Sequence, residues 1–334
     1  MIKLESNNQI DKLKWQQLVE ESTVATFFQT VDCYEFYQKN SFFESFVFAV
    51  SENDKLVGLA CGYLVGEGKG IKNYLSSRVI IPGGLLLSSD ISSEALSILL
   101  NEIKKTFAKR VVYIEIRNYN DYSCFKNQII ETGFSYEPHL NIVVPISTKE
   151  QAISNLSVTK RRQIKLSEKS GVSCVISKNI ADLKGFYEIL SNLYLLKIKK
   201  PLFPFEFFEK LLNEDFTRFF VVKKNDRVLG GILTVALSDK VLYEWYICGE
   251  DKETDAYPSL IATWKAIEYA TENGFKFFDF MGAGKPNEDY GVREFKSRFG
   301  GRHIDTGRFL FVSKPVVYNL AKTYLKIVKT KFST

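Results

Sequence analysis

The chain has 334 residues, of which 45% are hydrophobic and 14% aromatic, so it is long enough for two folded domains with packed cores. Residues 1–25 are polar and charged and lack the apolar segment of a secretory signal, and no apolar run reaches the roughly 18 residues of a membrane-spanning helix, which predicts a cytoplasmic protein. The formal net charge of +6 favours a phosphate-bearing or otherwise anionic partner.

Cysteine and histidine usage excludes several kinds of catalytic centre. The five cysteines are scattered, odd in number and contain no C-x-x-C pair, which argues against a disulfide framework and a zinc site. The only histidines are His139 and His303, and neither lies near a G-x-S-x-G sequence. We therefore expect no metal, no cofactor and no acyl-enzyme intermediate formed by a histidine-activated nucleophile.

A repeated pattern predicts two copies of one α/β domain. VFAVSENDKLVG (47–58) and FFVVKKNDRVLG (219–230) align without gaps, and each predicts a strand, an Asn-Asp turn and a second strand. Each copy is followed by a further strand and a glycine turn, VVYIEI with ETGF and FKFFDF with RFGG. A chance similarity between two hairpins is the alternative.

Three further segments have clear local patterns. TKRRQIKLSEKSGV (159–172) predicts a basic helix closed by Gly171 that bridges the domains. VLYEWYICG (241–249) predicts a strand with Tyr243, Trp245 and Ile247 on one face and Glu244 with Tyr246 on the other. YPSLIATWKAIEYATENGFKFFDF (257–280) predicts an amphipathic helix ending at Gly274, followed by an aromatic strand.

The C-terminal segment KPVVYNLAKTYLKIVKTKF (314–332) predicts a helix with one apolar face. Val317, Ala321, Tyr324 and Val328 share that face, and lysines lie beside it. Two interpretations follow: a terminal helix that docks on the second domain, or a helix that makes a peripheral contact with the membrane.

The longest motifs are similar to those of a known family. WKAIEYATENGFKFFDFMGAG (264–284) and YGVREFKSRFGG (290–301), with FFQTVDCYEFY (27–37) and KRRQIKLSEKSGV (160–172), resemble the bacterial Fem (FemA/FemB/FemX-like) aminoacyltransferases. The resemblance covers most of the chain and implies a duplicated N-acetyltransferase-like (GNAT) fold and extension of peptidoglycan stem peptides from aminoacyl-tRNA. The chain departs from the family at Cys33, where tryptophan is usual, and has no sequence for a long helical arm.

The resemblance also implies roles for individual residues. Phe295 and Lys296 match the Phe-Lys pair at the aminoacyl-tRNA end of the family's site, where the lysine is essential. Tyr243 or Tyr246 matches a substrate-contacting tyrosine. The remaining substrate-binding candidates are basic and would contact phosphates or the acceptor: Lys197, Lys199, Lys200, Arg78 and Arg298.

Aminoacyl transfer explains why a fixed cation is needed. Negative charge builds on the carbonyl oxygen and the leaving hydroxyl during attack by an amine, and a positioned cation stabilises it. In EFKSRFGG we expect Phe295 and Phe299 to form a dry slot for Lys296. The alternative is that Lys296 is an ordinary solvated lysine.

Asp279 lies within the aromatic strand FFDF, where an unpaired carboxylate is costly to bury. We expect it to have partners among Arg293, Lys296, Arg298 and the backbone N–H groups of residues 282–284, and to hold the turn that follows. A general-base role is the alternative.

These observations predict an α/β (α+β) chain of two tandem GNAT-like domains with mixed sheets flanked by helices, residues 1–150 on the acceptor side and 151–334 on the donor side. The predicted reaction is aminoacyl transfer, from aminoacyl-tRNA, to an amine on a nucleotide-sugar or lipid-linked cell-wall precursor. An acyl-CoA-dependent N-acyltransferase is the alternative, although the nearest pyrophosphate-loop candidate, residues 63–68, lacks the expected Gln or Arg and contains Glu67. A non-enzymatic module that binds a polyanion or a membrane is the third interpretation.

Overall fold

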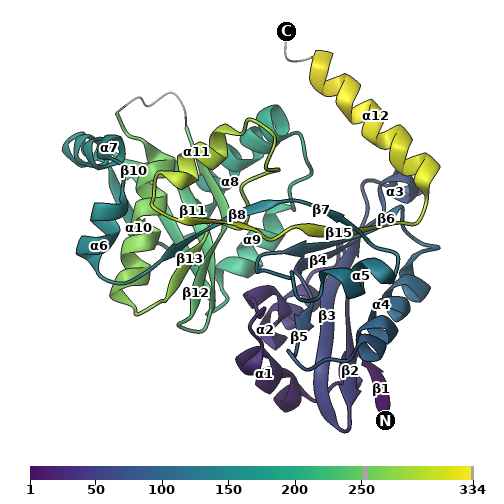
Figure 1. Ribbon diagram of the computed structural model, residues 1–334. Helices are drawn as coiled ribbons and strands as arrows, with labels where there is room; N and C mark the ends of the chain where they lie inside the picture. The colour runs from purple at the N-terminus through teal and green to yellow at the C-terminus, as the bar shows by residue number, and fades with distance from the viewer. Residues whose placement is uncertain (251–254, 332–334) are drawn as a thin grey trace. The chain divides into compact units, whose positions relative to one another are not determined.

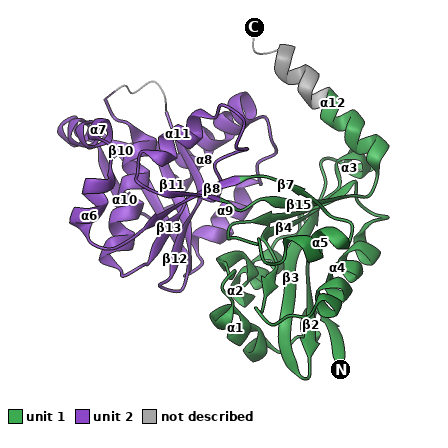
Figure 2. Ribbon diagram, in the orientation of Figure 1, with its two compact units in different colours: residues 1–139, 305–334 green, residues 140–304 purple. Residues whose placement is uncertain are grey.

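The computed structural model describes residues 1–250 and 255–331, with side chains up to residue 323. These residues form two compact units, shown in Figure 2. Unit 1 comprises residues 1–139 together with the C-terminal segment from Asp305, and unit 2 comprises residues 140–304. The prediction of domains at 1–150 and 151–334 therefore differs from these units in two places: residues 140–150 belong to unit 2, and the C-terminal segment belongs to unit 1.

Unit 1 is a mixed sheet with helices packed against it (Figure 1). Its strand order is β1-β2-β3-β4-β6-β15-β7, and β5 pairs with β3. The strands are β1 (Ile2–Ser6), β2 (Glu44–Glu52), β3 (Lys55–Val65), β4 (Arg78–Gly83), β5 (Leu86–Leu87), β6 (Tyr113–Asn118), β7 (Ser135–Glu137) and β15 (Arg308–Val312). The helices are α1 (Lys12–Glu21), α2 (Val31–Gln38), α3 (Gly70–Ser76), α4 (Ser93–Phe107), α5 (Lys126–Glu131) and α12 (Pro315–Lys331).

Unit 2 is a second mixed sheet flanked by helices, with strand order β14-β8-β13-β12-β11-β10-β9. Its strands are β8 (Leu140–Pro145), β9 (Ser173–Ile176), β10 (Thr217–Lys224), β11 (Arg227–Leu237), β12 (Val241–Gly249), β13 (Phe277–Asp279) and β14 (Arg302–Asp305). Its α-helices are α6 (Lys149–Asn155), α7 (Val158–Lys169), α8 (Ile180–Leu193), α9 (Phe205–Leu212), α10 (Pro258–Glu272) and α11 (Gly291–Ser297).

The two predicted hairpins are confirmed as β2–β3 and β10–β11. Asn53 and Asp54 form the first turn with φ of 48° and 64°, and Asn225 and Asp226 form the second with 49° and 62°. Asn and Asp tolerate this left-handed backbone better than most residues, which is why the same pair serves both turns. The second strand of each hairpin also has a bulge at the equivalent place, at Val57 of β3 and at Leu229 of β11.

Both units also contain a parallel strand pair joined by a helix. In unit 1, α4 lies between β4 and β6 in sequence, and in unit 2, α10 lies between β12 and β13; each pair of strands is parallel. Leu260, Trp264 and Ile267 recur at helical spacing in α10 and are buried in the core of unit 2, and Gly274 has φ of 75° just after the helix, as predicted. Two domains of one architecture, each with its own core, are thus confirmed.

The C-terminal segment joins unit 1 because β15 completes its sheet. β15 pairs antiparallel with β6 on one side, Arg308 opposite Arg117, and with β7 on the other, Arg308 opposite Glu137. α12 follows β15 directly and begins in unit 1, where Tyr318 packs on Tyr113 with ring centroids 5.5 Å apart. The predicted basic helix 159–171, in contrast, is α7 of unit 2. Among the described residues, no helix is both long enough and apolar enough to cross a bilayer.

Candidate functional site

The parallel strands β12 and β13 part from each other at one end of the unit 2 sheet. They pair only from Val241–Tyr243 with Phe277–Asp279, although β12 continues to Gly249. Glu244 and Phe280 are the first residues beyond the paired segments. Backbone groups at such a divergence lack ladder partners and must be satisfied by other groups. This is where the charged residues of the site meet.

Lys296 fills the divergence from α11. Its Nζ donates hydrogen bonds to the carbonyl oxygens of Phe280 at 2.6 Å and Gly282 at 3.0 Å, and lies 3.1 Å from Oε1 of Glu244. An ammonium group has three N–H donors, so these three partners engage all of them. Lys296 and Glu244 are both buried. The lysine thus ties α11 to β12 and to the turn after β13.

Asp279 holds that turn together with Asn141 of β8. The Asn141 Nδ2 donates to both carboxylate oxygens of Asp279, at 2.9 and 3.0 Å, and the Met281 N–H donates to Oδ1 at 2.6 Å. The Asn141 Oδ1 in turn accepts from the N–H of Gly282 at 2.8 Å. Met281 has φ of 54°, an unfavourable value for a side chain of its size, and these hydrogen bonds stabilise it.

Burial perturbs both carboxylates of the site. It raises the pKa of Asp279 to about 7, against the hydrogen bonds from Asn141 and Met281 and the charge of Lys296, which all lower it. Burial also raises the pKa of Glu244, against the lowering effect of Lys296. One oxygen of Glu244, Oε2, has no hydrogen-bond partner among the described residues, which adds to the cost of its charge.

We expect these shifts to make the protein less stable as the pH rises. The folded-state pKa of Asp279, about 7, exceeds its ordinary value near 4, so the folded state binds the proton more tightly than the unfolded chain. Its stabilising contribution is fully present below about pH 4 and is lost as the pH rises through about 7. Urea unfolding at pH 5 and pH 8 measures this. The pH-dependent difference should shrink in Asp279→Asn, and an equal difference in both proteins would contradict the assignment.

A second buried lysine lies on the aromatic rings expected around Lys296. The Nζ of Lys160, from α7, is 4.0 Å from the ring centroid of Phe295 and 5.7 Å from that of Phe299. Burial lowers the pKa of Lys160 to about 8. The ring beside Lys296 is instead that of Phe280, 5.3 Å from Nζ. The expected slot of Phe295 and Phe299 therefore faces Lys160, because adjacent residues of a helix point about 100° apart.

The two candidate tyrosines of β12 are both buried, Tyr243 beside the divergence and Tyr246 in an aromatic cluster. Tyr243 is the register partner of Asp279. A bulge at residue 245 places Tyr246 and Glu244 opposite consecutive residues of β11, so the predicted strict alternation of faces is wrong here. Tyr246 packs on Phe208 of α9, with ring centroids 4.8 Å apart.

The basic candidates lie on separate elements. Arg298 follows α11, two residues after Lys296. Its Nη2 lies 3.8 Å from Oε2 of Glu294. Arg78 begins β4 of unit 1 and contacts Glu67 at 3.5 Å. The last three lie on or just after the π-helical turn Tyr194–Ile198 and are exposed: Lys197, Lys199 and Lys200. The structure brings Lys296, Phe295, Asp279, Tyr243 and Arg298 to one end of unit 2.

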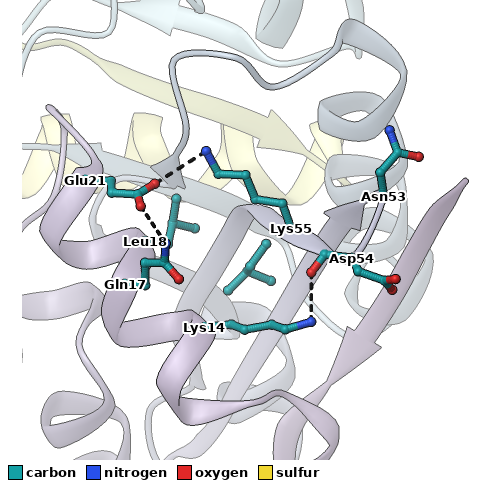
Figure 3. Close-up of a pocket in the computed structure, with 8 residues that line it drawn as sticks. Lys14, Gln17, Leu18, Glu21, Asn53, Asp54 and Lys55 are labelled. Atoms are coloured by element: carbon teal, nitrogen blue, oxygen red, sulfur yellow. Dashed lines mark hydrogen bonds and ion pairs between the residues drawn. The ribbon is translucent and has the colours of Figure 1, made fainter.

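A surface pocket of about 290 Å³ in unit 1 is a poor candidate for a catalytic site (Figure 3). It lies between α1 and the turn at Asn53 and Asp54. Its polar groups satisfy one another: Lys14 donates to the Asp54 carbonyl at 2.8 Å, and Lys55 is 3.4 Å from Glu21.

The described residues offer little for metal or thiol chemistry. No group of three or more His, Cys, Asp or Glu side chains among them is placed to hold a metal ion. Burial raises the pKa of Cys33, Cys61 and Cys248 and that of Cys174 to about 12, so these four thiols stay protonated near neutral pH and are poor nucleophiles.

One family model matches part of the chain. Residues 155–297 match the family model described as an acetyltransferase (GNAT) domain. These residues include α7, β12, β13 and α11, and hence Lys160, Glu244, Asp279 and Lys296. No curated protein matches the sequence. The family match confirms an acyltransferase domain in unit 2.

Solved structures show that the whole chain has the tandem fold. FemX is similar over 95% of this chain and 99% of its own, with a TM-score of 0.70 and 16% identity. A tandem GNAT protein from the clavulanic acid biosynthesis pathway is similar over 94% of this chain and 99% of its own, with a TM-score of 0.59 and 7% identity. The C-terminal domain named for a putative lysylphosphatidylglycerol synthetase from Agrobacterium fabrum is similar over 96% of this chain and 97% of its own, with a TM-score of 0.57 and 11% identity. The predicted FemX-like, tandem GNAT-like fold is confirmed.

Proposed function

We propose that the protein transfers an aminoacyl group from aminoacyl-tRNA to an amine on a cell-envelope precursor of the peptidoglycan stem-peptide type. The observation that carries the proposal is the buried Lys296, bound at the divergence of two parallel strands in an acyltransferase domain. A FemX structure and a structure named for a lysylphosphatidylglycerol synthetase share the tandem fold, and aminoacyl transfer is the chemistry that suits both names.

The reaction needs charge stabilisation more than a covalent intermediate. The acceptor nitrogen forms a bond to the ester carbonyl carbon, the bond from that carbon to the ribose oxygen breaks, and the amine loses a proton while the leaving hydroxyl gains one. The field of Lys296 stabilises the negative charge on the carbonyl and leaving oxygens. Since all three of its N–H groups are engaged in the resting protein, a direct hydrogen bond to the substrate requires one of them to be released.

Charge supports tRNA as the donor. α7 carries Arg161, Arg162, Lys165 and Lys169, of which the last three are exposed, and the whole chain has a net charge of +6. Exposed basic side chains on one helix bind a phosphate backbone without sequence specificity. Acyl-CoA is the second candidate donor, and the description of the matching family as acetyltransferases favours it.

A donor screen tests the proposal. We expect product from charged tRNA and none from acetyl-CoA without RNA, and the reverse result would refute the donor assignment. With charged tRNA, the KM for the donor should rise steeply with salt, because each neutralised phosphate releases counterions. Arg162→Gln with Lys165→Gln should raise that KM and flatten the salt dependence. The control, Lys39→Gln with Lys109→Gln, replaces exposed lysines of unit 1 and should change neither.

The proposed acceptor places the enzyme at the inner face of the membrane. Peptidoglycan precursors are nucleotide-linked or lipid-linked, and basic residues are suited to the phosphates of either form. Lys197, Lys199, Lys200 and Arg78 are our candidates for these contacts. We propose a cytoplasmic enzyme with a peripheral membrane contact.

A further inference from the structure

Unit 1 exposes an apolar surface formed by two helices that are distant in sequence. α3 presents Ile71, Tyr74 and Leu75 to solvent, and the first turns of α12 present Val316 and Leu320. In Figure 1, α3 lies beside the start of α12. We call these five residues the α3–α12 surface.

Lys314 joins the two helices. Its Nζ lies 3.6 Å from the centroid of the Tyr74 ring and has no hydrogen-bond partner among the described residues. This cation–π contact ties the residue before α12 to α3. The spacing within each helix is also regular: Ile71 and Leu75 are four residues apart, as are Val316 and Leu320, so each pair shares one face of its helix.

The charged residues of the two helical segments themselves are all basic. Residues 68–77 and 313–331 together contain seven lysines and no aspartate or glutamate. Lys69, Lys72 and Lys322 are exposed. A helix face with exposed apolar residues and lysines, and without acidic residues, is typical of proteins that bind at the surface of an anionic membrane.

We propose that the α3–α12 surface binds the surface of an anionic phospholipid membrane. Lysines would contact the lipid phosphates while Ile71, Leu75, Val316 and Leu320 enter the headgroup region. An RNA backbone would also attract the lysines but gives no reason to expose four aliphatic side chains, because phosphates and riboses offer no apolar layer. The role of this surface in the cell rests on the proposed envelope function. The lipid binding itself does not, since it is measurable without donor or acceptor.

Vesicle flotation of the full chain tests the proposal with a closely matched pair of variants. Ile71→Ser with Val316→Ser removes side chains that are 79% and 73% exposed, and Leu13→Ser with Val158→Ser removes side chains that are 79% and 74% exposed elsewhere. Neither pair belongs to the core, so both variants should fold. We expect the wild type to float with vesicles of phosphatidylcholine and phosphatidylglycerol, and not with phosphatidylcholine alone.

The first variant should bind the anionic vesicles about tenfold less tightly, and the control variant as tightly as the wild type. Lys69→Gln with Lys72→Gln should also lose about tenfold or more. Absence of flotation at low salt would overturn the proposal, as would an equal loss in the two serine variants. Loss of tRNA binding in the lysine variant, without any vesicle binding by the wild type, would assign the surface to RNA instead. Because the assay contains no acyl donor, its failure leaves the transferase proposal standing.

Discussion

Replacing Lys296 with methionine is expected to lower the rate constant for acyl transfer about 100-fold or more, the scale of losing one group that stabilises an oxyanion. Methionine keeps most of the length of the side chain and removes its charge. Arginine should restore little activity, because a planar guanidinium does not fit a site where two carbonyls and Glu244 surround a compact ammonium group. Single-turnover kinetics with charged tRNA measures the chemical step directly.

The buried ion pair makes a second variant necessary. Lys296→Met alone leaves Glu244 buried without a counter-ion, which destabilises a protein by about 3–5 kcal/mol when the charge persists. Adding Glu244→Gln removes that charge and should restore much of the stability to denaturant. If activity stays low in the stable double variant, Lys296 acts on the reaction; if activity returns, its role is structural and the catalytic proposal is refuted. Lys285→Met, an exposed lysine of the same segment, is the control and should stay within a few-fold of the wild type.

Local patterns were sufficient for much of the fold. The Asn-Asp hairpins, the helix before β13 and its closing glycine each depend on neighbours in the chain, and each was predictable. The place of residues 305–331 was not, because it depends on β15 pairing with β6, whose register joins Arg308 to Arg117 across almost two hundred residues. A strand of five residues gives no local signal for a distant partner.

The site was predictable where a residue is unusual for its surroundings. Asp279 within an aromatic strand signalled a need for buried partners, but the predicted ones were wrong: its hydrogen bonds come from Asn141 and the Met281 N–H, not from Arg293, Lys296, Arg298 or the N–H groups of residues 282–284. Asn141 lies 138 residues earlier, although an asparagine within the apolar strand Leu140–Pro145 is the same kind of signal. The burial of Lys160 was not predictable, because a lysine is not unusual among its neighbours in the chain. In a helix with four other basic residues, nothing in the sequence distinguishes the one lysine that is buried.

Replacing Asn141 with alanine is expected to lower the free energy of unfolding by about 2–4 kcal/mol, because it removes the side-chain amide that donates to both oxygens of the buried Asp279 and an acceptor for the Gly282 N–H. Chemical denaturation near pH 8, where Asp279 is mostly ionised, measures the loss. Asn118→Ala is the control. Asn118 is also buried, but among the described residues its side chain donates only to the Thr306 carbonyl, at 3.0 Å, so we expect a loss of about 1 kcal/mol.

Exchanging the side chains of Asn141 and Asp279 separates the effect of their hydrogen bonds from the effect of their packing. Asn141→Asp alone places two carboxylates in contact and should be destabilised further as the pH rises above 7, and Asp279→Asn alone places two amide groups face to face. In the double exchange, the amide at position 279 can donate to the carboxylate at 141 and still accept from Met281, while that carboxylate accepts from Gly282. We therefore expect the double variant to be more stable than either single one. Additive losses would show that the pair does not act as a hydrogen-bonded unit.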